Sequence, residues 1–219
     1  MKSSRKAPLR PPRLPPDLLP GNVRALEDEG EYAAAVLADS DFSRQTARSV
    51  AFDQVVLRHV SLGRARLPNM RMSDVRLEAS DLSGASVQKA RWHRVEFIGC
   101  RLTGMQLSQF SGGDLLFKEC TLESALFTSG RFRSVHFERC NMRRVLLEKI
   151  DLAGAAFLGC DLTGADLTGS TLKGADFRGS DLTGVRVEGR QLQGITIDAF
   201  QAIQVAALLG IIVKDPGDQ

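Results

Sequence analysis

Residues 151–184 read DLAGA-AFLGC-DLTGA-DLTGS-TLKGA-DFRGS-DLTG when they are written in groups of five. In every group the second residue is leucine or phenylalanine and the fourth is glycine. An α-helix repeats its buried face about every 3.6 residues and a β-strand about every 2, so neither produces a strict period of five. A chain that turns a corner after each group does produce it.

The same frame extends to both sides of this stretch without a slip. Every fifth position from Tyr32 to Ile197 is apolar except Gly112, which makes 33 apolar positions in 34. A second column of smaller residues, such as Val60 and Ala85, runs two residues earlier. The longest apolar run, residues 205–213, is too short for the ~18 residues that a membrane span needs.

The groups Ala165-Asp166-Leu167-Thr168-Gly169 and Ala175-Asp176-Phe177-Arg178-Gly179 resemble the pentapeptide-repeat family, whose consensus is A-(D/N)-L-x-x. The resemblance covers residues 30–197. It implies an all-β fold, a right-handed quadrilateral β-helix with four pentapeptide sides in each 20-residue coil. The covered length then corresponds to about 8 coils.

Charged residues test the 20-residue coil independently, because like charges on neighbouring strands destabilise a sheet and opposite charges stabilise it. Between residues 40 and 197, ten pairs 20 residues apart have opposite signs and three have the same sign. The ten are Arg58/Glu78, Asp74/Arg94, Arg76/Glu96, Asp81/Arg101, Arg94/Asp114, Lys118/Glu138, Glu119/Arg139, Glu123/Arg143, Arg131/Asp151 and Asp166/Arg186. The three are Arg44/Arg64, Arg71/Arg91 and Asp161/Asp181.

Glycine marks the expected corners. It occupies every fifth position from Gly154 to Gly194, where a type II turn requires a positive φ. Residues 41–150 mostly lack these glycines, which predicts less regular corners there. In Phe110-Ser111-Gly112 a large residue occupies the position that is small in other groups, and a glycine occupies the position that is large. The residues 20 positions before and after have the opposite sizes and so compensate in volume. We therefore expect an unbroken helix through Gly112.

The N-terminal end has a different composition. Residues 1–20 contain six of the eight prolines and carry a formal charge of +4, whereas the remaining residues sum to −1. These features predict a disordered or PPII-like, basic, Pro-rich tail over residues 1–20, in which two PxxP matches carry little weight. Residues 21–29 are expected to be a lead-in and the first irregular coil to begin near residue 30.

The C-terminal end is expected to be capped over residues 198–213, followed by a tail over residues 214–219. Asp198 and Gln201 fit a helix N-cap with its capping-box partner, and Gly210 fits the C-terminal stop. Phe200 and Ile203 recur at helical spacing, which predicts a helix over about 199–209 and an extended piece after it. The apolar residues of this segment leave two interpretations open, a plain cap or a homodimer contact.

No residue pattern indicates catalysis, a cofactor or a metal. Cys100, Cys120, Cys140 and Cys160, flanked in phase by Ser80 and Ser180, form a line of stacked positions that suits neither zinc nor disulfides. The expectation is four free, buried thiols, which fits a reducing, cytoplasmic location. His59, His93 and His136 share no face. The column Asp41, Asp81, Asp161 and Asp181 is expected to be solvated and structural.

The flanks remain as candidate recognition surfaces. One flank carries basic residues interspersed with acidic ones: Arg71, Arg91, Arg94, Arg131, Arg133 and Lys173 with Asp53, Asp74, Asp114 and Asp151. Apolar residues are also expected on the outside: Ile98, Leu116 and Leu158 on one flank, Leu126 and Leu146 on the opposite one. Both a solvated surface and a partner site are compatible with these patterns.

Three function classes follow. The first is a non-enzymatic solenoid that presents a rigid surface to a protein partner of unknown identity. The second comes from the resemblance, because some members of the family resemble duplex DNA in size and charge and bind DNA gyrase, giving quinolone resistance or self-immunity. Such mimicry needs a strongly acidic surface, whereas this solenoid is nearly neutral. The third is a nucleic-acid or membrane-surface binder that acts through the basic tail.

Overall fold

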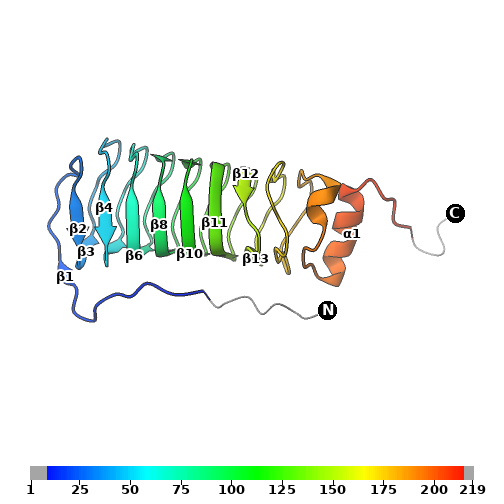
Figure 1. Ribbon diagram of the computed structural model, residues 1–219, viewed down its shortest axis with the longest axis horizontal. Coiled ribbons are helices and arrows are strands. Elements are labelled where there is room, and N and C mark those ends of the chain that lie inside the picture. Colours follow the sequence, from blue (N-terminus) through cyan, green and yellow to red (C-terminus); the bar gives the residue numbers. More distant parts are fainter. Residues whose placement is uncertain (1–8, 215–219) are drawn as a thin grey trace.

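The computed structural model describes residues 9–214 and forms one elongated solenoid that ends in a short helix (Figure 1). Its strands are β1 (Leu19–Pro20), β2 (Glu31–Ala33), β3 (Ala35–Ala38), β4 (Ala51–Asp53), β5 (Val56–Arg58), β6 (Arg71–Glu78), β7 (Ser86–Gln88), β8 (Arg91–Ile98), β9 (Gln106–Ser108), β10 (Ser111–Lys118), β11 (Leu126–Glu138), β12 (Leu146–Asp151) and β13 (Ala156–Leu158). The 3-10 helix η1 (Gly189–Leu192) and the α-helix α1 (Ala199–Leu208) follow. Within the described part of the chain, no helix has the length and apolar character that a membrane span requires.

Each coil stacks on the next in parallel, with partners 20 residues apart, as in Tyr32↔Phe52 and Met72↔Trp92. The row that starts at Glu31 and ends at Thr171 contains eight rungs, and therefore seven turns, of this ladder. The 20-residue coil and the all-β solenoid with a short C-terminal helix are thus confirmed.

The charge pairs behave as the ladder requires. Seven of the ten opposite-sign pairs form ion pairs between neighbouring coils. Most of them are exposed, and each such pair contributes ~0–1 kcal/mol to stability. Arg94 and Asp74 form the least exposed pair, with 15% and 7% of their side chains accessible.

The core is built from stacked columns of inward side chains. Phe97, Phe117, Phe137, Phe157 and Phe177 form one such column, in which neighbouring ring centroids lie 4.6–5.0 Å apart and the rings are within 11° of parallel. All five rings are at most 2% exposed. Because each coil buries its rings against the coils before and after it, the sides of the solenoid keep fixed spacings.

The corners share a positive φ whether or not they contain glycine. Non-glycine residues at the fourth position of the pentad, such as Arg64 and Ala79, adopt φ values of +46° to +61° between Glu29 and Lys149. Their backbone N–H groups donate to the next coil, as in Arg64 N to Ser83 O at 2.8 Å. This hydrogen bond holds the left-handed corner without glycine. The corners over residues 41–150 are mixed, some being turns, some bends and some parts of strands, whereas those over residues 151–184 are nearly all turns, as expected. Gly189 lies in η1 and does not share the positive φ of the other glycines from Gly154 to Gly194.

This geometry predicts opposite effects for exchanging alanine and glycine at two corners. Gly174→Ala should lower the free energy of unfolding by about 1 kcal/mol, because its φ is +70° although no atom lies within 4 Å of the new Cβ. Ala79→Gly should raise it by a smaller amount, because Ala79 already has a φ of +46°. Urea denaturation measures both changes, and equal signs would contradict the assignment of strain to these corners.

The β-helix is unbroken at Phe110-Ser111-Gly112, as expected. Ser111 pairs in register with both Arg91 and Arg131. The Phe110 ring is 5% exposed and fills the space above Gly130, where a Cβ atom would lie 2.3 Å from the ring. The swap of large and small residues is therefore an exchange of volume between neighbouring coils.

Two glutamines close the C-terminal end of the core. Asp198 and Gln201 form the expected capping box of α1, and the buried Gln201 side chain donates to the carbonyl oxygens of Phe177 at 2.5 Å and Ser180 at 2.7 Å. Gln191 of η1, which the sequence did not predict, makes the equivalent bonds ten residues earlier. The side of α1 that contacts the core includes Val205 and Leu208.

The outer side of this cap is apolar. Phe200 and Ile203 face away from the solenoid with exposures of 74% and 57%, and Ile212 is 82% exposed. The spacing of Phe200 and Ile203 therefore predicted a helix correctly, but these two residues do not pack on the last coil.

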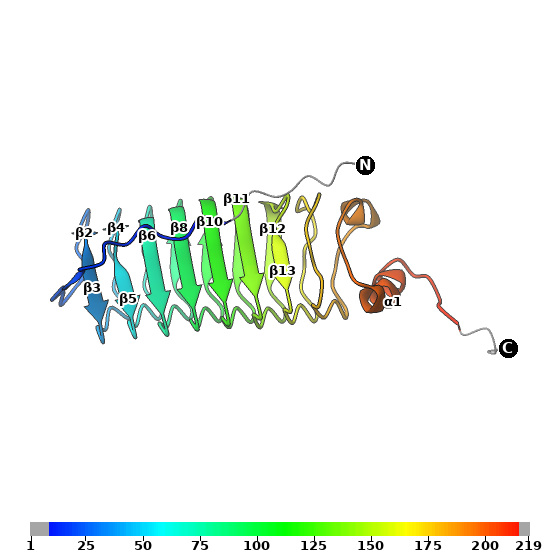
Figure 2. The same ribbon diagram turned by 90° about the horizontal axis from the view of Figure 1, so that it is seen from below.

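The N-terminal segment also differs from its expectation. Residues 9–20, which we call the strap, lie extended along the solenoid and reach β10 (Figure 2). The strap ends in β1, which pairs with β3 through Leu19↔Ala35. Residues 1–8 of the expected disordered tail, and residues 215–219 of the expected C-terminal tail, lie outside the described residues. Specific contacts of Arg10 and Arg13 hold the strap against the solenoid.

Candidate functional site: an arginine-lined groove

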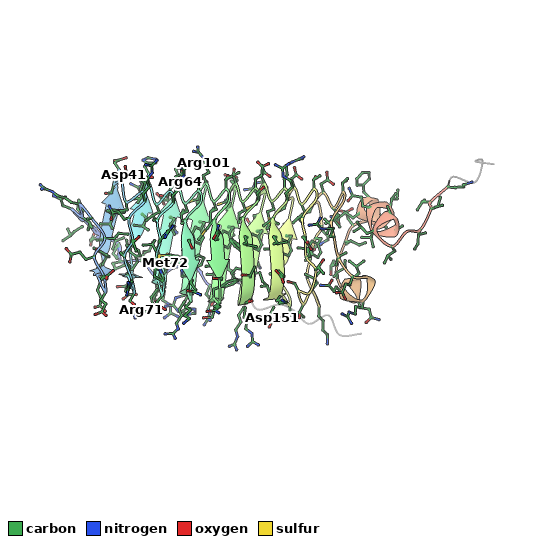
Figure 3. The ribbon with its side chains drawn as sticks, turned by 90° about the horizontal axis from the view of Figure 1, so that it is seen from above. Asp41, Arg64, Arg71, Met72, Arg101 and Asp151 are labelled. Atoms are coloured by element: carbon green, nitrogen blue, oxygen red, sulfur yellow. The ribbon has the colours of Figure 1, made fainter. Side chains whose placement is uncertain are left out.

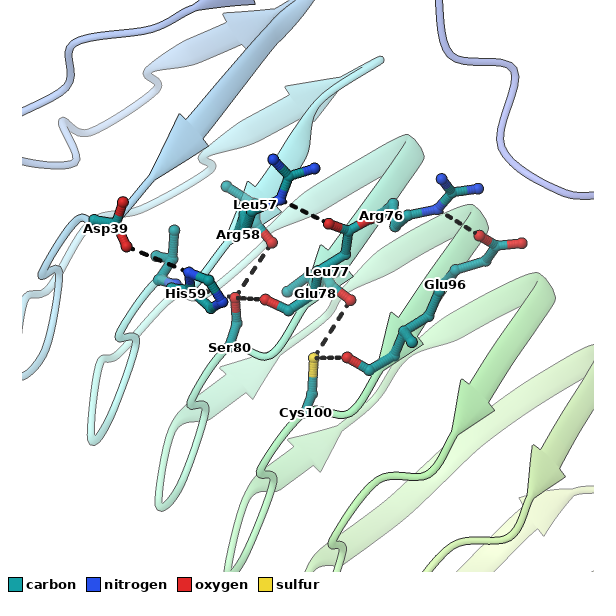
Figure 4. A network of polar contacts seen from close by, with 12 residues as sticks. Asp39, Leu57, Arg58, His59, Arg76, Leu77, Glu78, Ser80, Glu96 and Cys100 are labelled. Carbon is teal, nitrogen blue, oxygen red and sulfur yellow. Dashed lines mark hydrogen bonds and ion pairs between the residues drawn. The ribbon is translucent and has the colours of Figure 1, made fainter.

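The cysteines form the stacked column that their spacing predicts. All four are buried free thiols. Each Sγ donates to a carbonyl oxygen 23 residues earlier at 3.3–3.4 Å, and Ser80 makes the same bond at 3.3 Å (Figure 4). Hydrogen bonds to neighbouring thiols, together with burial, raise the pKa of Cys120 and of Cys160 above its ordinary value. Among residues 9–214, no group of three or more histidines, cysteines and carboxylates is arranged to hold a metal ion.

These thiols should react slowly with a chromophoric disulfide reagent while the protein is folded, because all four are buried and the reagent cannot reach them. After unfolding in guanidinium, all four should react at the rate of free cysteine. The time course of absorbance measures both phases. Rapid labelling of Cys120 or Cys140 in the folded protein would contradict the buried column.

The aspartate column has a structural role. Its members are Asp41, Asp81, Asp161 and Asp181, and each accepts the backbone N–H two residues further on at 2.8–3.0 Å. Hydrogen bonds from Ser43 and Thr183 lower the pKa of Asp41 and of Asp181, respectively. The lowered pKa keeps Asp41 and Asp181 ionised near neutral pH, and all four hydrogen bonds stabilise turns.

The three histidines are separated, as expected. His59 Nδ1 lies 3.4 Å from Asp39 Oδ1, and His136 Nδ1 lies 3.9 Å from Glu138 Oε1. His93 contacts the guanidinium of its neighbour Arg94. Only His93 lies at the main groove of the molecule.

That groove has a volume of about 750 Å³ and crosses β2, β4, β6, β8, β10 and β11. We define the groove face as residues 31–33, 51–53, 71–73, 91–93, 111–113 and 131–133. Figure 3 shows Arg71 and Asp151 on this side of the solenoid, with Asp41, Arg64 and Arg101 on the opposite side.

Strand geometry explains why the groove is hollow. The first and third residues of each segment point outward, while the second, such as Met72 or Trp92, is buried. Three outward residues near the middle are small, namely Ser73, Ser111 and Gly113. A Cβ atom added to Gly113 would lie 3.5 Å from His93 Nδ1, so this position has room for a side chain.

The walls of the groove are basic. Arg71 and Arg91 are ladder partners, a like-charge pair of the kind that destabilises a sheet. Arg71 reaches Glu31 at 3.7 Å, and Arg131 reaches Asp151 at 3.1 Å. In the described part of the chain no ion pair engages Arg91 or Arg133, whose side chains are exposed.

The structure brings together only part of the predicted flank. Arg71, Arg91, Arg131, Arg133 and Asp53 line the groove. Lys173 and Asp151 lie outside its lining. The remaining members, Arg94, Asp74 and Asp114, belong to the corner that borders the groove face.

The strap covers this corner. The Arg10 guanidinium contacts Asp114 at 2.7 Å, and the Arg13 backbone N–H donates to Asp74 Oδ1 at 2.8 Å. Gln54, at the same corner, donates to the Arg13 carbonyl at 3.3 Å. Arg94, with the Arg13 N–H, lowers the pKa of Asp74, so that this carboxylate stays ionised.

Sequence analysis missed the strap. A signal was present, because Asp74 and Asp114 occupy the corner position that glycine fills elsewhere and the tail contains Arg10 and Arg13 in a Pro-rich stretch. Carboxylates that are 7% and 6% exposed need nearby donors, since an unpaired buried charge is costly.

The apolar residues expected on the flanks are only half-buried positions of the ladder: Ile98, Leu116, Leu158, Leu126 and Leu146. The large exposed apolar side chains are found instead at Leu19 of the strap and on the C-terminal cap. The flanks therefore offer no broad apolar patch, and the groove is the more distinctive surface.

Residues 90–167 match the family model described as a pentapeptide repeat region. This part of the chain is a pentapeptide-repeat region. Its frame continues beyond the matched residues on both sides, as the ladder from Glu31 to Thr171 shows.

Solved structures of pentapeptide-repeat proteins are similar to this chain at low sequence identity. HetL from the cyanobacterium Nostoc sp. strain PCC 7120, involved in heterocyst differentiation regulation, is 22% identical, with 78% of this chain and 86% of HetL covered and a TM-score of 0.39. QnrB1, a plasmid-mediated fluoroquinolone resistance protein, is 21% identical, with 89% and 94% covered and a TM-score of 0.39. Rfr23 from the cyanobacterium Cyanothece 51142 is 18% identical, with 53% and 67% covered and a TM-score of 0.30. No curated protein matches the chain.

Proposed function

We propose that this protein is a non-enzymatic scaffold that binds a protein partner through its groove face. The stacked core fixes the spacing between coils, so little conformational entropy is lost at the surface when a partner binds. The cysteine and aspartate columns, which carry the most reactive side chains, are used for packing and turns.

The observation that carries the proposal is that Arg91 and Arg133 are exposed and form no ion pair in the described part of the chain. Seven ladder pairs of opposite charge on the solenoid are joined in ion pairs, one of them through Arg131 of the groove. Arg91 and Arg133 border a hollow of about 750 Å³ and have no such partner among residues 9–214. Arginines around a depression are typical of the anchor points of protein interfaces.

Site-specific photo-crosslinking in the cells that produce the protein tests this function. A photoreactive residue at Ser111 lies in the groove, whereas the same residue at Thr121 lies on the opposite side of the solenoid. We expect Ser111, but not Thr121, to give a discrete protein adduct that disappears on Arg91→Glu. Adducts of equal yield at both positions, or none at Ser111, would overturn the assignment.

DNA gyrase is the partner that the family resemblance suggests. Residues 21–219 carry nearly equal numbers of basic and acidic side chains, so the solenoid does not have the charge of DNA. We expect micromolar protein to leave gyrase supercoiling unchanged, both with and without a quinolone. Inhibition or protection would instead identify gyrase as the partner of this scaffold.

We also propose that the C-terminal cap joins two copies of the chain. Phe200, Ile203 and Ile212 are 74%, 57% and 82% exposed, which is unusual for a cap that faces water. Light scattering after gel filtration should give a dimer mass for the native chain and a monomer mass for Phe200→Glu/Ile212→Glu. A monomer at all concentrations for the native chain would contradict the dimer.

A further inference from the structure

We propose that the groove binds a short, extended, acidic peptide segment of the partner, with the strap as a supporting wall. This inference rests on the proposed function and names the chemistry of the bound segment. Its evidence lies in the charges of the groove, its dimensions and the contacts of the strap.

The charges favour carboxylates. Arg91 lies directly beside Arg71 in the ladder. Arg131 and the exposed Arg133 lie two residues apart in a segment that is separated from that of Arg91 by residues 111–113. A row of carboxylates placed between these arginines would form charge-assisted hydrogen bonds and offset the repulsion between Arg71 and Arg91. Arginine also pairs with carboxylates in a bidentate geometry.

The dimensions favour a single chain. The two outward rows of the groove face lie two residues apart along each strand, or about 7 Å. The basic part runs from the coil of Arg71 to the coil of Arg131, three ladder steps or about 14 Å. An extended peptide covers that length with about four residues, at about 3.3 Å each.

Carboxylates at both ends of the basic part limit the length of the acidic segment that can bind. Glu31 and Asp53 lie in the groove lining on one side, and Asp151 follows Arg131 on the other. These carboxylates disfavour a long polyanion that continues past the arginines. Single-stranded nucleic acid also gains much of its affinity from stacking on aromatic rings. Trp92 and Phe52 in the lining are 3% and 2% exposed, so their faces are not available for stacking.

The strap contributes by engaging the carboxylates at the border of the groove face. Asp74 and Asp114 would otherwise repel an acidic segment lying next to them. Arg10 pairs with Asp114, while Arg94 and the Arg13 N–H hold Asp74. The Arg10 side chain is 62% exposed, so it keeps part of its positive potential at the edge of the groove.

Fluorescence anisotropy with a labelled peptide of about eight glutamates tests the proposal on the full chain. We expect Arg91→Glu/Arg133→Glu to weaken binding by at least about tenfold, since it removes two charge-assisted contacts. Gly113→Val should also weaken binding by filling the hollow without changing charge, and Arg10→Ala should weaken it by about two- to fivefold. Arg66→Glu is the matched control, because Arg66 is an exposed ladder arginine on another side of the solenoid, and it should leave binding unchanged.

Several outcomes would overturn the proposal. Binding that survives Arg91→Glu/Arg133→Glu, or that Arg66→Glu weakens equally, would show that the peptide does not use the groove. Stronger binding of a duplex DNA of about 20 base pairs, lost in the same double variant, would assign the arginines to a nucleic acid. Thermal unfolding of each variant verifies that it is folded. If Ser111 gives a protein adduct but the glutamate peptide does not bind, the scaffold function stands and the acidic nature of the bound segment is rejected. If the peptide binds but Ser111 gives no adduct, the protein partner is rejected.

Discussion

Replacing Phe117 by alanine should lower the free energy of unfolding by about 3–5 kcal/mol. Its ring lies between Phe97 and Phe137, at centroid distances of 4.6 and 4.9 Å, and is fully buried. The substitution removes ring contacts with two coils at once, and the ladder prevents the coils from closing the cavity. Urea denaturation followed by circular dichroism measures the change.

Thr128→Ala provides the control for this experiment. Thr128 lies in β11 on a partly exposed outward position, so its replacement should change the free energy of unfolding by less than about 0.5 kcal/mol. Similar losses for Phe117→Ala and Thr128→Ala would contradict the division into inward and outward columns. A second, separate transition in the Phe117→Ala curve would show that the stack also couples the two halves of the solenoid.

The architecture could be predicted because its physical cause is local and repeated. An apolar residue at every fifth position specifies which side chain points inward in each group, and opposite charges 20 residues apart specify the length of a coil. Even the irregular group at Phe110 followed from volume, since large and small residues exchange places between adjacent coils. One-dimensional repetition allows such inferences because each coil contacts only its neighbours.

The positive φ of the corners without glycine escaped prediction because glycine was treated as the cause of the left-handed turn. The structure shows that Arg64, Ala79 and other residues adopt the same φ, because their N–H groups are fixed by hydrogen bonds to the next coil. The propensity of glycine for a positive φ therefore indicates where a corner is favourable, whereas the hydrogen bonds between coils determine where corners form.

The groove and the strap could be predicted only in part. Arg71, Arg91, Arg131 and Arg133 were assigned to one flank from the frame alone. The hollow between them depends on Ser73, Ser111 and Gly113, whose small size matters only when their coils are stacked. The strap depends on contacts across 61 and 104 residues, from Arg13 to Asp74 and from Arg10 to Asp114, for which no periodic signal exists.

The second large effect concerns the exchange of volume at Gly130. Gly130→Ala should lower the free energy of unfolding by about 1–3 kcal/mol, because its Cβ would lie 2.3–2.5 Å from three carbon atoms of the Phe110 ring. Phe110→Ala alone should cost about 3–5 kcal/mol through the cavity it leaves. In the Phe110→Ala background, however, Gly130→Ala should cost nothing or restore part of the lost stability, since the obstructing ring is gone.

The double-mutant cycle therefore isolates a contact between two adjacent coils. Gly113→Ala is the control, because its new Cβ would point outward and meet His93 Nδ1 at an ordinary 3.5 Å, so its effect should be the same in both backgrounds. A cost for Gly130→Ala that does not depend on residue 110 would mean that Phe110 does not fill the space above the neighbouring coil. The expected coupling of at least about 1 kcal/mol would show that the irregular group is held in register by packing, which also keeps Ser111 at the centre of the groove.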